Sequence, residues 1–152
     1  MNTVDNIKLA NVIVWLPFLC VSLFTVRAQS FTDLGSFKSP SGNIFCIATK
    51  DDFSGKTTVS LSCELVVSSA KLPPKPSDCG LDWGKRFYVE ARGKALRACY
   101  GDTIVNPNYP TLGYGQVWQV GGFRCDASPV RLRCANLERH GFELSKARQN
   151  LF

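Results

Sequence analysis

The chain has 152 residues, with 18 Lys plus Arg against 12 Asp plus Glu and a formal net charge of +6. A chain of this length is expected to form one domain. Its 45% hydrophobic and 20% charged residues argue against a disordered chain, collagen or a coiled coil. The positive charge favours an anionic partner without identifying one. Seven cysteines are present, and this odd number needs an explanation.

The first segment, residues 1–28, has the build of a secretory signal peptide. An uncharged, mostly apolar stretch at 9–26 ends in Val26-Arg27-Ala28, with small residues at the two positions that signal peptidase reads. A retained membrane anchor is the alternative, because about 18 such residues can just span a bilayer. Pro17 and the small-residue end favour cleavage. We therefore expect a single disulfide-rich β domain at 29–152, secreted or periplasmic, with no membrane span after signal cleavage.

Cleavage after Ala28 would resolve the odd cysteine count. It removes Cys20 and also two of the 18 basic and one of the 12 acidic residues, which leaves a net charge of +5. Six cysteines in a small exported domain predict three disulfides. The sequence has no CxxC pair and only one His, which argues against a zinc site. We expect no metal and no cofactor.

The first predicted hairpin joins residues 43–49 to residues 57–66. The first strand, NIFCIAT, follows a turn at Ser41-Gly42-Asn43, and the second, TTVSLSCELV, alternates apolar and polar residues along its length. The intervening residues 51–55 are predicted to form the loop. Pairing these strands places Cys46 opposite Cys63.

An extended proline-containing connector at 72–76 leads to a second predicted hairpin. Residues 86–91 and 94–99 flank Arg92-Gly93, which has the residue types of a tight turn. A loop at 106–114 follows, and this loop includes Tyr114.

Next in the chain come a strand at 116–120 and the pair Gly121-Gly122, which allows a bulge or sharp bend. In the third hairpin, Cys125 lies opposite Cys134 across a turn at 127–129, with Val130 and Leu132 on the same face as Cys134. Asp126 is then opposite Arg133, an expected cross-strand ion pair. Cys79 and Cys99 remain to pair with each other.

A short strand is predicted at 142–144, and residues 145–152 are expected to form one helical turn begun by Ser145. No segment shows a sustained helical period. The sequence therefore predicts an all-β fold, a small disulfide-stapled sandwich or barrel of antiparallel hairpins.

These residues resemble a family of small secreted bacterial proteins that is catalogued only as a domain of unknown function. The resemblance covers residues 36–152 and rests on an SPSGNI-x-C pattern from Ser39 to Cys46, followed by DWG at 82–84, C-x-GDT at 99–103, YG at 114–115 and HGF-x-LS at 140–145. Arg139 stands where the family more often has Gly. The resemblance implies a secreted or periplasmic single domain and supplies no activity.

Catalytic candidates are few. His140 is the only side chain whose ordinary pKa lies near neutrality, and a nucleophilic site needs it beside a carboxylate, here Asp102 or Asp82, and a hydroxyl from Ser41 or Ser145. No GxSxG elbow is present. The favoured alternative gives His140, Asp82 and Asp102 structural roles in turns.

Binding candidates come from the positive charge and from aromatic loops. Arg124, Arg131 and Arg133 share the face opposite Cys125 and Cys134, which predicts a basic patch; the aromatic candidates are Trp83 and Tyr114.

Two functions follow. The favoured one is a non-catalytic binding or inhibitor module for an anionic polymer, a glycan or another envelope protein, with nucleic acid disfavoured for an exported chain. The alternative is a small exported hydrolase that uses His140 with Asp102 or Asp82. The sequence does not indicate an oligomeric state.

Overall fold

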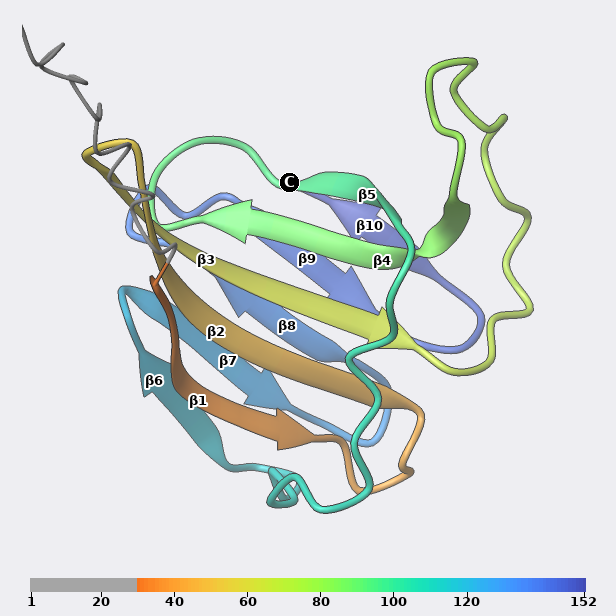
Figure 1. Cartoon of the computed structure of the whole chain (residues 1–152). Helices are drawn as coiled ribbons and strands as arrows, with labels where there is room; N and C mark the ends of the chain where they lie inside the picture. Colours follow the sequence, from red (N-terminus) through yellow and green to blue (C-terminus); the bar gives the residue numbers. More distant parts are fainter. Residues whose placement is uncertain (1–29) are drawn as a thin grey trace, which may run out of the picture.

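A computed structural model of the chain describes residues 30–152, which form a β-sandwich of two five-stranded antiparallel sheets (Figure 1). The predicted signal peptide at 1–28 and Cys20 lie outside the described residues. The first sheet contains, in spatial order, β1 (Ser30–Lys38), β2 (Ile44–Phe53), β3 (Lys56–Leu65), β4 (Asp82–Glu90) and β5 (Leu96–Tyr100). The second contains β10 (Gln149–Leu151), β9 (Gly141–Leu144), β8 (Leu132–Ala135), β7 (Phe123–Ala127) and β6 (Val117–Val120). The all-β prediction is confirmed.

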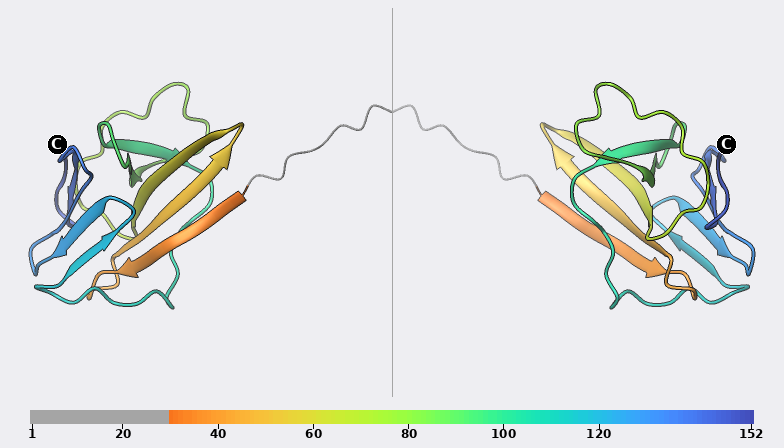
Figure 2. Two further views of the ribbon diagram at one scale, coloured as in Figure 1. Left: turned by 90° about the vertical axis from the view of Figure 1, so that its left-hand side faces the viewer. Right: turned by 90° about the vertical axis from the view of Figure 1, so that its right-hand side faces the viewer.

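The core lies between the two sheets, which Figure 2 shows from the side as two layers. Because side chains alternate along each strand, one face of each sheet turns inward. The ring of Phe87 in β4 lies 5.9 Å from that of Phe142 in β9, and the rings of Phe37 and Trp118 are 5.0 Å apart. No helix in the described part of the chain is long and apolar enough to cross a membrane.

Two of the three disulfides cross-link neighbouring strands in the core. Cys46–Cys63 joins β2 to β3, and Cys125–Cys134 joins β7 to β8, at directly opposed register positions. All four cysteines are fully buried, and the sulfur atoms of Cys46, Cys63 and Cys134 lie within 4.8 Å of one another. The two cross-links therefore pack against each other across the sandwich, and their sulfur atoms are committed to disulfides rather than to a metal.

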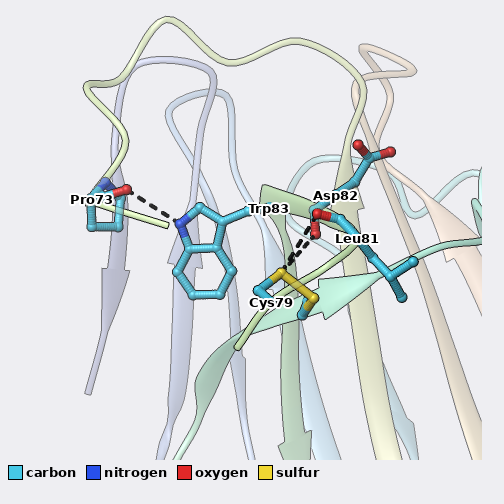
Figure 3. Close-up of a disulfide and its surroundings, with 6 residues drawn as sticks. Pro73, Cys79, Leu81, Asp82 and Trp83 are labelled. Atoms are coloured by element: carbon cyan, nitrogen blue, oxygen red, sulfur yellow. Dashed lines mark hydrogen bonds between the residues drawn. A yellow bond between two sulfur atoms is a disulfide. The ribbon is translucent and has the colours of Figure 1, made fainter. Parts of the chain in front are cut away.

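The third disulfide, Cys79–Cys99, ties the proline-containing loop after β3 to the edge strand β5 (Figure 3). Cys99 is exposed, unlike the core cysteines. The Trp83 indole N–H donates to the Pro73 carbonyl at 3.2 Å and holds the same loop. All three disulfides join the pairs expected from the sequence, and each closed loop stabilises the fold by about 3 kcal/mol in the chain-entropy model.

The connection from β5 to β6 crosses the outer face of the first sheet (Figure 1) and is fixed there by a buried ion pair. The Glu64 carboxylate lies 2.7 Å from the Arg86 guanidinium, and it also accepts from the Thr103 hydroxyl at 3.1 Å and the Ile104 backbone N–H at 2.9 Å. Arg86 in turn donates to the Asp102 carbonyl at 2.7 Å. This buried carboxylate is therefore occupied in holding the crossing segment.

The structure corrects the first two predicted hairpins. β2 continues to Phe53, so Asp51 and Asp52 belong to the strand and pair with β3, and the tip is the two-residue turn Ser54-Gly55. The second hairpin has a wide loop at 91–95 instead of a tight turn. The reason is that the end of β4 pairs with β3 only, and β5 begins at Leu96 opposite Tyr88.

The C-terminal half differs from expectation at two places. Gly121-Gly122 is the sharp bend of the two predicted alternatives, a tight turn between β6 and β7 with positive φ at both residues. Val130 lies in the turn before β8 and is 76% exposed instead of facing the core. The predicted helical turn after Ser145 is wrong. The Ser145 hydroxyl does accept the Arg148 N–H at 3.0 Å, but residues 149–151 then pair with β9 as a strand.

Candidate functional site

A groove of about 520 Å³ opens at one end of the sandwich. Its lining comes from the β1–β2 turn, Val67 after β3, the segment before β6, the β7–β8 turn and the β9–β10 loop. The two turns and the β9–β10 loop lie on the right-hand side of Figure 1. Three core residues form its floor: Ile44, Leu132 and Leu144, each at most 5% exposed. The rim carries exposed apolar side chains, Val67, Tyr114 and Val130, together with Pro40 and Pro129.

The charged residues that line the groove are both cations, Arg131 and Lys146, and no Asp or Glu lines it. Arg131 is compensated from outside, because its guanidinium lies 3.2 Å from Asp126 and 3.6 Å from Glu143. Lys146 is exposed, and its ammonium has no hydrogen-bond or ion-pair partner among residues 30–152. The groove is therefore apolar inside, with one uncompensated positive charge at its edge.

The polar groups of the groove are mostly used within their own turns. The Ser39 hydroxyl accepts the Ile44 N–H at 3.0 Å and lies 3.0 Å from the Ser41 hydroxyl. The Asn43 side chain donates to the Val67 carbonyl at 3.0 Å and accepts from its N–H at 2.8 Å. These bonds shape the turns and leave the groove with few free donors or acceptors.

The candidate nucleophiles and His140 lie at different ends of the sandwich. Ser41 and Ser145 line the groove, but no His or carboxylate does. His140 follows β8 at the other end, where its backbone N–H donates to the Asn136 side chain at 3.0 Å. Its loop contacts the loop after β4, since the Leu137 N–H donates to the Ala91 carbonyl at 3.3 Å.

The candidate carboxylates lie far from His140. Asp82 is the first residue of β4 and pairs with Tyr100, and Asp102 follows β5 beside Arg86. The length of β4, about 26 Å at about 3.3 Å per residue, separates Asp82 from the His140 end. The carboxylate near His140 is Glu138, whose pKa is lowered by a hydrogen bond from the Gly93 N–H and by Arg92. The structure thus brings His140 together with neither Asp102 nor Asp82.

The predicted basic patch on the outer face of the second sheet is largely neutralised. Arg133 is indeed opposite Asp126, but its guanidinium lies 3.0 Å from Glu143 of β9 and stacks over the Phe152 ring, while Asp126 pairs with Arg131. The expected Asp126–Arg133 ion pair is therefore wrong, because β9 places Glu143 directly opposite Arg133. Arg124 alone of the three arginines is exposed without a carboxylate partner in the described part of the chain.

Of the five binding candidates, Tyr114 and Arg131 line the groove, whereas Arg124, Arg133 and Trp83 do not. Trp83 packs against the proline-containing loop beside the Cys79–Cys99 disulfide instead (Figure 3). Val67, Val130 and Lys146 were missed. The available signal for this surface is the apolar Val130 within the turn sequence Ser128-Pro129-Val130-Arg131, because an apolar residue in a turn is exposed unless a partner covers it.

The fold and groove define a disulfide-cross-linked antiparallel β-sandwich with an apolar opening at one end. The sequence model of a protein family described as a family of unknown function (DUF6636) matches residues 18–152. The chain therefore belongs to that family. No curated protein and no solved structure matches the chain.

Proposed function

We propose that the protein is an exported, non-catalytic binding or inhibitor module and that the groove is its binding site. The observation that carries this proposal is the exposure of Val67, Tyr114 and Val130 around an opening whose floor is the hydrophobic core. Exposed apolar side chains gain stability when a partner covers them, and a concave apolar site with a few polar groups is typical of ligand binding. The uncompensated Lys146 favours a partner with negative charge.

Export is supported by the disulfides and by the N-terminal segment. Disulfides persist in oxidising compartments, and three of them cross-link 123 described residues. Residues 1–28 supply the predicted signal, so we propose a mature domain that begins at Gln29 in the periplasm or outside the cell. N-terminal sequencing of the exported protein tests this, and a protein that begins at Met1 contradicts it.

The hydrolase alternative draws no support from the geometry. A nucleophilic mechanism needs a hydroxyl within hydrogen-bond reach of a base. The two candidate hydroxyls lie at the groove, and the hydroxyl of Ser145 is already bonded to Arg148. His140 lies at the other end of the sandwich.

The binding site is tested by capture from envelope extract with the oxidised protein as purified after export. Val130→Asp places a negative charge on the rim of the groove, and Leu137→Asp is the matched control, an exposed apolar loop residue at the other end. We expect the wild type and Leu137→Asp to capture the same envelope components, and we expect Val130→Asp not to capture them. The same retained set for both variants, or an empty set for the wild type, contradicts the proposal.

A further inference from the structure

We propose that the groove binds the acyl chain of an anionic amphiphile, with the chain between the two sheets and the head group at Lys146. This inference rests on the proposed function and names its ligand class. The chain would contact the floor residues Ile44, Leu132 and Leu144 and would be covered at the rim by Val67, Tyr114 and Val130. A volume of about 520 Å³ lies within the range of small-ligand pockets.

The hydrogen bonding of the groove favours an acyl chain over a peptide or a glycan. A peptide brings one N–H and one C=O per residue, and each needs a partner when it leaves water. The lining turns close on themselves: the Ser39 N–H donates to the Ile44 carbonyl at 2.8 Å, that of Ser128 to Arg131 at 2.9 Å, and that of Ser145 to Arg148 at 2.8 Å. An acyl chain has no such groups to satisfy.

The charges of the lining set the polarity of the head group. With Lys146 unpaired and no carboxylate in the lining, a carboxylate or phosphate is favoured over an ammonium group or a zwitterion. An ion pair at an exposed lysine is weak because water screens it. Most of the affinity therefore comes from burial of methylene groups, and the affinity should rise about fourfold per methylene until the groove is full.

The test uses the oxidised protein as purified after export and saturated fatty acids of increasing length, at concentrations below micelle formation. Displacement of a fluorescent fatty acid is the readout. We expect saturable binding of the acids, the fourfold increments, and several-fold weaker binding of the primary alcohol of equal length. Lys146→Glu should weaken the acid and leave the alcohol unchanged, whereas Val130→Asp should weaken both.

Matched controls lie at the other end of the sandwich. Lys56→Glu makes the same charge change as Lys146→Glu but at the start of β3, and Leu137→Asp matches Val130→Asp. Both should bind like the wild type. Extraction of the exported protein with organic solvent, followed by mass spectrometry, distinguishes a free fatty acid from a phospholipid as the natural source of the chain.

Absence of saturable binding at every chain length, or binding that Val130→Asp does not change, overturns the inference. If no fatty acid binds but capture of an envelope component still depends on Val130, the proposed binding function stands and the proposed acyl ligand is wrong. If both experiments fail, both proposals fall.

Discussion

The two ends of the sandwich are built from similar turns, yet one is closed and the other is open. At the closed end, Asn136 is 6% exposed, and its side chain links the two sheets. Its amide donates to the carbonyls of Glu90 at 2.9 Å and Gly93 at 2.7 Å, and its oxygen accepts from the N–H groups of Glu138 and His140, each at 3.0 Å. Two of these hydrogen bonds tie the β8–β9 loop of one sheet to the end of β4 and the β4–β5 loop of the other, and the other two shape the β8–β9 loop itself.

At the open end, a second asparagine makes bonds of the same kind within a single sheet. Asn43 precedes β2 and bonds both backbone groups of Val67, which follows β3 in that sheet. The sheets are linked here where the Ser69 N–H donates to the Lys146 carbonyl at 2.8 Å and the Gln149 side chain donates to the Ser68 hydroxyl at 3.0 Å. The comparison teaches that an asparagine with partners in the facing sheet ties the two sheets together, whereas one with partners in its own sheet does not.

Replacing the two asparagines should separate the ends by stability. Asn136→Ala removes four part-buried hydrogen bonds, and we expect a loss of about 3 kcal/mol, since each hydrogen bond contributes about 0.5–1.5 kcal/mol. Asn43→Ala removes two bonds at a half-exposed site where water can replace them, and should cost about 1 kcal/mol. Urea unfolding of the oxidised protein measures both.

The same pair of variants can break the comparison. If the closed end depends on Asn136, hydrogen exchange in Asn136→Ala should accelerate at residues 91–95 and 137–140 and remain slow around the groove. Equal losses of stability for the two variants would mean that the hydrogen bonds of Asn136 add nothing to the contact between the sheets beyond the packing of the hydrophobic core.

Local patterns in the sequence predicted the strands, while the groove depends on the packing of distant turns. Alternation in 57–66 and the two cysteine-containing hairpins predict β3 and the disulfides Cys46–Cys63 and Cys125–Cys134, because neighbouring residues carry that information. Cys79–Cys99 followed only as the remaining pair. β1 escaped prediction since its register shifts between Asp33 and Gly35, which interrupts the alternation. The groove joins residues 39–43 to 127–132 and 144–147, and only the order of the strands brings these together.

The order of the strands also determines which carboxylate pairs with Arg133. Arg133 is predicted opposite Asp126, and this register is confirmed. Its salt bridge goes to Glu143 because β9 lies on the other side of β8, a neighbour that the hairpin pattern does not specify.

Arg139 gives a smaller test at the closed end. Its φ is 66°, a left-handed conformation that costs a side chain about 1–2 kcal/mol. Arg139→Gly removes this strain. It also gives the unfolded chain more conformational freedom, which destabilises the fold by about 0.4–1 kcal/mol. We therefore expect a net gain of up to about 1 kcal/mol in urea unfolding. The matched control outside the Asn136 loop is Ser54→Gly, at the β2–β3 tip, where φ is 50°. If Arg139→Gly lowers the free energy of unfolding and Ser54→Gly does not, the Arg139 side chain supports the loop that contains Asn136.

The smallest effect is expected from Glu138, and it depends on pH. A hydrogen bond from the Gly93 N–H at 2.8 Å, followed by the Arg92 guanidinium, lowers the pKa of this carboxyl from its ordinary value of 4.5. A carboxyl with a lowered pKa stabilises the fold above its unfolded pKa, and this contribution disappears as the pH falls through the folded pKa.

The stability difference between wild type and Glu138→Gln should therefore be constant above about pH 5.5, which is about one unit above that ordinary pKa. The difference should vanish in more acidic solution. The carboxyl is exposed, so added salt should shrink the difference. If the free energies of unfolding of the two proteins vary with pH in parallel, the Glu138 carboxylate does not help to link the sheets. The closed end would then depend on Asn136 and on the backbone hydrogen bond from Leu137 to Ala91.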